Sequence, residues 1–77
     1  MRNNYYVRSD QEIGRTLQSV REERGLTRRQ VCHLIGYMSV NAAVNLYHWE
    51  HGDFGIPKLW VRRLSEALSI PCSLLLP

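Results

Sequence analysis

Two short polar motifs mark where helices begin in this 77-residue chain. Residues 9–12 (SDQE) and 27–30 (TRRQ) have the capping-box pattern. In such a box, a hydroxyl group and the side chain of a Glu or Gln three residues later accept hydrogen bonds from backbone amide groups that would otherwise have no partner at the start of the helix. Gly25 and Gly36 follow the two motifs, and glycine readily adopts the left-handed conformation that ends a helix. The pattern therefore predicts two short helices, each closed by a glycine.

Apolar residues recur at helical spacing along the rest of the chain. A third helix is expected to begin near Ser39 or Asn41 and to stop at Gly52, and Pro57 suits the first turn of a fourth. Residues 72–76 can form one or two further turns. The residues predicted to face inward are Ile13, Leu17, Val20, Val31, Leu34, Ile35, Ala42 or Ala43, Leu46, Trp49, Trp60, Val61, Leu64 and Leu68.

Length and composition favour one small domain. The chain is predicted to be all-α, a compact bundle of four to five short helices over residues 9–77, after a flexible arm of residues 1–8. No apolar run approaches the ~20 residues of a membrane-spanning helix, and the polar start lacks the apolar core of a secretion signal. A cytoplasmic protein is expected, in which Cys32 and Cys72 stay thiols.

Charge is distributed unevenly around a neutral segment. The formal net charge is +3, yet residues 31–49 contain no Lys, Arg, Asp or Glu. Such a distribution suits a protein whose flanking parts hold phosphates while the middle meets bases. The bracketing cations are Arg15, Arg21, Arg24, Arg28 and Arg29 before the neutral segment, and Lys58, Arg62 and Arg63 after it. Of these, Arg62 and Arg63 are expected to be ordinary solvated charges rather than phosphate ligands.

The order of these motifs resembles the phage repressor and Cro type of helix-turn-helix domain. The resemblance spans about residues 13–75 and rests on "REERGLTRRQVCHLIGY", on Glu50-x-Gly52 and on "LSEALSIPCSLL". It implies a DNA-binding transcriptional regulator, an autoregulating phage or mobile-element repressor that binds a palindromic operator in double-stranded DNA as a homodimer. The stretch from Gly36 to Glu50 is longer than is usual in this family, so either the turn or the third helix is extended.

The resemblance also implies which residues contact DNA. The asparagine side chain can donate a hydrogen bond to N7 of adenine and accept one from the N6 amino group. An alanine methyl group can pack on the thymine methyl group. Asn41 could instead be only a cap, and His48 could simply interact with the helix dipole. The expected base-reading residues are Asn41, Ala42, Asn45 and His48, and the expected phosphate-binding residues are Arg28, Arg29, His51 and Lys58.

The resemblance implies one ion pair, and the apolar end of the chain suggests a dimer interface. Family members join the first and third helices by a partly buried ion pair, which Arg21 and Glu50 match. Leu74, Leu75 and Leu76 offer more apolar surface than one short helix can bury. Part of that triplet, Leu74 and Leu76 with Trp60, is the candidate dimer seam, with Phe54 as another possible member. The alternative is that the leucines merely cover the core.

Other classes of function find less support. Cys32 and His33 are neighbours, so on a helix they point about 100° apart and cannot form a nucleophile and base couple. His48 and His51 could share a metal ion, but a structural zinc site needs two more ligands. No enzyme activity, metal, cofactor or small-molecule ligand is therefore expected.

The serious alternative is a helix-turn-helix scaffold that binds protein through its neutral third helix, as an adaptor, antitoxin or inhibitor. Tyr37 and Met38 could cover the end of the second helix, or Tyr37 could touch a phosphate. Tyr47, Trp49 and Trp60 are expected in the core rather than as stacking platforms for bases.

Overall fold

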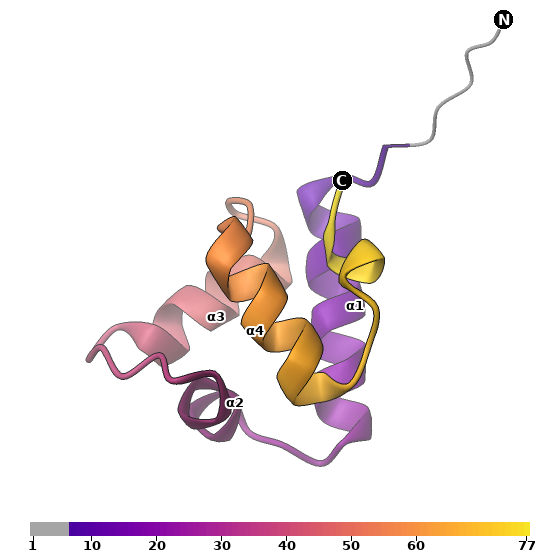
Figure 1. The fold of residues 1–77 in the computed structure, drawn as a ribbon. Helices are drawn as coiled ribbons and strands as arrows, with labels where there is room; N and C mark the ends of the chain where they lie inside the picture. Colours follow the sequence, from indigo (N-terminus) through magenta and orange to yellow (C-terminus); the bar gives the residue numbers. More distant parts are fainter. Residues whose placement is uncertain (1–6) are drawn as a thin grey trace, which may run out of the picture.

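The computed structural model describes residues 7–77, which form helices and no strand. The elements are α1 (Asp10–Glu23), α2 (Arg28–Ile35), α3 (Ala42–His51), α4 (Lys58–Leu68) and a short 3-10 helix, η1 (Cys72–Leu75). Helix α3 packs against α1 and α2, α2 also packs against α4, and η1 contacts both α1 and α4 (Figure 1). The all-α prediction is confirmed. Residues 1–6 of the predicted arm lie outside the described residues.

Both predicted capping boxes are present. At α1, the Ser9 hydroxyl accepts from the Glu12 amide at 3.1 Å, and the Ser9 amide donates to the Glu12 carboxylate at 2.9 Å. The Thr27 hydroxyl and the Gln30 side chain make the same pair of bonds at α2, at 3.1 and 2.8 Å. Each box satisfies amide groups that a helix start would otherwise leave without a partner. These two helices therefore begin where the sequence predicts.

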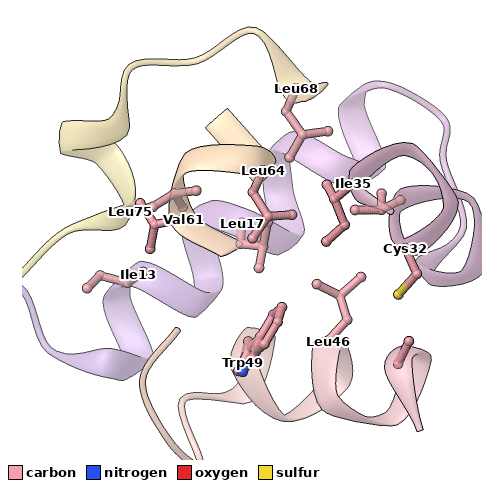
Figure 2. Close-up of a cluster of buried hydrophobic side chains, with 12 residues drawn as sticks. Ile13, Leu17, Cys32, Ile35, Leu46, Trp49, Val61, Leu64, Leu68 and Leu75 are labelled. Atoms are coloured by element: carbon pink, nitrogen blue, oxygen red, sulfur yellow. The ribbon is translucent and has the colours of Figure 1, made fainter. Parts of the chain in front are cut away.

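The core lies between the four helices, where Leu17, Leu46 and Leu64 are fully buried (Figure 2). Two predicted core residues are corrected. Leu34 is 57% exposed, because α2 turns Val31, Cys32 and Ile35 inward and places Leu34 beyond them. Tyr47 is also exposed, because the inward stripe of α3 runs through Ala42, Leu46, Trp49 and Glu50.

Close contact between α1 and α3 depends on Gly14. A Cβ atom at this position would lie 2.3 Å from the Trp49 carbonyl oxygen and 2.5 Å from that of Glu50. Both are backbone atoms, so only a shift of one helix could make room. Gly52, at the end of α3, has φ +71° and its Cβ would meet the Gln11 backbone at 2.5 Å. Two glycines thus set the position of α3 on the body of the protein.

The extra residues of the long central segment lie in the turn between α2 and α3. Helix α3 has ten residues, and residues 36–41 connect it to α2. Tyr37 fixes this turn, because its ring stacks on Trp60 at 4.5 Å between centroids and on Trp49 at 5.9 Å. The Tyr37 ring therefore packs against tryptophans of α3 and α4, and its predicted contact with a phosphate stays a prediction.

The two ends of the described chain meet beside α1. The Arg8 side chain donates to the carbonyl oxygens of Ser73, at 2.6 Å, and Leu76, at 3.2 Å. Arg8, which the sequence assigns to the flexible arm, is thus held against the segment that follows α4. Figure 1 shows the C-terminal end of the chain beside the start of α1. Among residues 7–77, no helix has the length and apolar character needed to cross a membrane.

Candidate nucleic-acid interface

The exposed side of α3 carries no acidic side chain. The carboxylate of Glu50 is the only one on this helix, and it is buried. Because Leu46 and Trp49 point inward, Val44 and Tyr47 point outward, and Val44 is 54% exposed. At 100° per residue, His51 falls between Val44 and Tyr47 on this outward face, His48 lies on one flank of it, and Asn41 precedes the helix as its N-cap residue. Apart from the two histidines, the side chains that α3 itself contributes to this face are therefore uncharged, while the Asp53 carboxylate borders the face at His48 and the Arg28 guanidinium borders it at Tyr47.

Two asparagines at the start of α3 have different environments. Asn41 occupies the N-cap position and is exposed, but its side chain does not cap the helix. Its amide group therefore stays available for a ligand. Asn45 is half-buried, and its Nδ2 donates a hydrogen bond to the Tyr37 hydroxyl. This bond orients the Asn45 amide and leaves its Oδ1 as an acceptor.

The prediction that Ala42 reads a base is wrong. Ala42 is only 4% exposed, and its methyl group belongs to the core with Leu46. The sequence left the start of α3 uncertain, and one residue along a helix rotates a side chain by about 100°. Ala43 is half-buried and Val44 is exposed, so the outward position falls two residues after Ala42.

The two histidines of α3 are both held by hydrogen bonds through Nδ1. In His48 this nitrogen donates to the Asp53 carboxylate at 2.7 Å, and the ring lies 5.5 Å from that of Phe54. In His51 it donates to the Tyr47 carbonyl oxygen at 2.9 Å, and the two rings are 4.0 Å apart. Each bond fixes the ring and leaves Nε2 to meet a ligand.

Arg21 and Glu50 form an ion pair that ties α1 to α3, at the two positions named from the family resemblance. Arg21 Nε lies 2.6 Å from one carboxylate oxygen and Nη2 lies 3.2 Å from the other. The Glu50 side chain has no exposed surface. A buried carboxylate of this kind needs its partners, because an unpaired charge in the interior is costly.

Arg28 also binds Glu50, which changes its predicted role. Its Nε donates to the carboxylate at 2.9 Å, and its guanidinium carbon lies 5.0 Å from the centre of the Tyr47 ring. Arg28 was expected to bind phosphate, but its side chain is engaged with α3 in the folded protein. No local pattern predicts this contact, because 22 residues separate the two partners and the family resemblance named only Arg21 as a partner of Glu50.

Arg29 and Lys58 are the predicted phosphate ligands that remain free. Both are exposed, and neither makes a hydrogen bond or ion pair within the described residues. Arg29 stands at the edge of a hollow of about 350 Å³ between α2, the turn and α3, whose lining includes Met38, Val40 and Ala43. Lys58 begins α4, where the positive end of the helix dipole also favours an anion.

Several exposed apolar residues beside this face were not predicted. Val40 is 97% exposed at the end of the turn, and Met38 and Val44 are exposed beside it. If Leu46 and Trp49 face inward, helical spacing places Val44 on the outward side of α3, so the sequence could have predicted its exposure. No spacing rule reaches Val40, which precedes the helix.

The two cysteines differ in environment. Cys32 is buried beneath this surface, and Cys72 is exposed in η1. Burial raises the pKa of the Cys32 thiol above its ordinary value of 9.0, and the nearby negative charge of Glu50 adds to the effect. Cys32 is therefore a neutral, inert core residue at ordinary pH.

Comparison with known proteins identifies the fold through structure. Neither a protein-family model nor a curated protein sequence matches the chain. The restriction-modification controller protein C.AhdI from Aeromonas hydrophila superposes with a TM-score of 0.74 at 21% identity, over 86% of this chain and 94% of that one.

Two structures of the DNA-binding domain of BldD give a similar result. The one from S. venezulae has a TM-score of 0.70 at 24% identity, over 88% of this chain and 96% of that one. The other has a TM-score of 0.72 at 22% identity, over 95% of this chain and all of that one. The chain therefore shares the fold of the C.AhdI and BldD domains, in agreement with the compact all-α bundle that its sequence predicts.

Proposed function

We propose that this protein is a sequence-specific regulator of transcription that binds double-stranded DNA. It acts in the cytoplasm as a homodimer on a palindromic operator and represses its own gene. The observation that carries the proposal is the outward face of α3, which exposes no acidic side chain, together with two exposed cations that are unpaired within residues 7–77, Arg29 on α2 and Lys58 at the start of α4. A polyanion can approach this face without meeting a like charge from α3.

Affinity and specificity are separable on this surface. Phosphate contacts supply most of the salt-dependent binding energy, and base edges in the major groove supply discrimination. Arg29, Lys58 and His51 are assigned to phosphates. Asn41 and the Oδ1 of Asn45 are assigned to base edges, together with Nε2 of His48.

The structural neighbours support the same function. BldD is represented by its DNA-binding domain, and C.AhdI is a controller protein of a restriction-modification system. Because these likenesses are likenesses of fold, function must be argued from the site itself. The free cations and the unpaired Asn41 amide supply that argument here.

A gel-shift assay with DNA from upstream of the protein's own gene, at two salt concentrations, tests the proposal. Arg29→Ala should weaken binding to all sequences and reduce the salt slope by about 1. Asn41→Ala should relax sequence preference at one base pair, by about 1–3 kcal/mol. Arg62→Ala removes the same charge one turn into α4 and serves as the control, with no change expected. Absence of a shift at low salt, or a flat salt response, would refute the proposal.

The proposed dimer seam consists of Leu74, Leu76 and Trp60. Leu76 is exposed, and Leu74 is half-buried. Trp60 is half-buried and stacks on Tyr37, so most of the apolar surface available to a partner subunit comes from the two leucines. Leu76→Asp should shift the dimer towards monomer in sedimentation experiments, whereas Leu59→Asp, at another exposed leucine, should not. Equal effects of the two changes would exclude this seam.

A second candidate function is binding of a protein through α2, the turn and α3. The observation that favours it is the set of exposed apolar side chains on these elements, which includes Leu34, Met38, Val40 and Val44. Apolar patches of this kind often mark protein contacts. Failure to bind any DNA duplex at low salt would favour this candidate over a DNA-binding regulator.

A further inference from the structure

The exposed valines at the start of α3 suggest which base the outward face of this helix recognises. Val40 lies just before α3 and is 97% exposed, and Val44 in the first turn of α3 is 54% exposed. Ala42, which lies between the two valines in sequence, and Leu46, which follows them, pack inward. The two valines therefore present branched apolar groups to whatever meets the start of α3.

The chemistry around the valines restricts their partner. A hydrophobic protein partner would also cover the free cation Arg29, at the cost of desolvating its charge. A DNA duplex would pair such cations with phosphates, and its major groove carries one apolar group, the 5-methyl of thymine. Arg29 borders the same hollow that Val40 lines, so a cation and an apolar group lie together here.

We propose that Val40 and Val44 read thymine by packing against its 5-methyl group in the major groove. The inference rests on the proposed DNA-binding function and adds to it the base that the neutral part of the surface recognises. Asn41 lies between the two valines in sequence and presents an exposed amide. The start of α3 thus combines an amide suited to adenine with methyl groups suited to thymine, which favours A·T-containing half-sites.

Substitution of uracil for thymine tests the inference, because it removes only the methyl group. A duplex is first selected from a random pool with the wild-type protein, and each thymine is then replaced by deoxyuridine in turn. Fluorescence anisotropy should show about threefold to fivefold weaker binding at one or two positions, the effect of one buried methyl group. Val40→Ala or Val44→Ala should bind the thymine duplex more weakly and lose the response to uracil at its own position.

Val7→Ala is the matched control. Val7 is exposed, but it adjoins Arg8, which is held against residues 73–76 and not against α3. This variant should keep the full response to uracil. Circular dichroism melts should show that all three variants remain folded, since each valine is exposed.

The outcomes separate this inference from the proposed function. Wild-type protein that binds every uracil duplex as tightly as the thymine duplex would overturn methyl reading and leave DNA binding intact. A uracil response that persists in both valine variants would also overturn it, because other residues would then contact the methyl. If no duplex is selected at low salt, DNA binding itself fails and the valines belong to a protein-binding surface.

Discussion

Removal of the Glu50 carboxylate should destabilise the protein severely. Glu50 is fully buried and accepts hydrogen bonds from Arg21 and Arg28, and Arg21 is itself almost buried. Loss of one partner of a buried pair costs about 3–5 kcal/mol, because it strands the other charge. A chain of this size is stabilised by only roughly 4–12 kcal/mol in total. Glu50→Ala therefore removes a large fraction of the folding free energy.

Thermal melts followed by circular dichroism measure the effect. In a domain of this size, each kcal/mol lowers the melting temperature by roughly 4–8 °C, so a fall of about 12 °C or more is expected. Glu50→Gln should cost nearly as much, because it keeps the shape but removes the charge. Adding Arg21→Met to Glu50→Gln should recover part of the loss, since it removes one stranded cation.

Glu23→Ala provides the comparison. Glu23 pairs with Arg24 at 3.2 Å, but its side chain is largely exposed, and such pairs contribute about 0–1 kcal/mol. The melting temperature of this variant should change by a few degrees at most. If Glu50→Ala melts as close to the wild type as Glu23→Ala does, the argument from stranded charge is refuted.

Four further predictions concern packing, the thiols and the turn. Gly14→Ala should lower stability by about 1–3 kcal/mol in urea denaturation, because its methyl group would collide with the α3 backbone, whereas Ser19→Ala on the exposed side of α1 should not. A thiol reagent should modify Cys72 before Cys32. The pKa of Cys32 is raised in the folded state, so the buried thiol contributes its full share of the folding free energy below pH 9.0 and a decreasing share as the pH rises further. Above pH 9.0 the wild type should therefore lose more stability than Cys32→Ala. Tyr37→Phe should cost about 0.5–1.5 kcal/mol, because it removes the hydrogen-bond partner of Asn45 and keeps the ring; an unchanged urea midpoint would show that this bond adds nothing.

Local signals predicted the beginnings of α1 and α2 well. A capping box depends on residues three positions apart, so its chemistry can be read directly from the sequence. The start of α3 could not be placed as firmly, because Asn41 does not cap it and no box precedes it. The error at Ala42 follows from this uncertainty, since a shift of one or two residues exchanges the inward and outward faces.

Contacts between distant residues were harder to predict. Of the neighbours Arg28 and Arg29, only Arg28 turns towards Glu50, and the packing of α2 on α3 decides which one does so. The same packing brings Asn45 to Tyr37. Resemblance to a known family named the Arg21 and Glu50 positions, but it did not name Arg28 as a third member of this ion pair.

The stack of Tyr37 between the two tryptophans gives the molecule an intrinsic optical probe. Trp49 and Trp60 both lie against this ring, and its hydroxyl group contacts Asn45 on α3. A ligand that pulls Asn45 outward must alter the surroundings of the stacked indoles. We therefore expect a ligand that displaces Asn45 to change the tryptophan emission, which can be measured in the unlabelled protein.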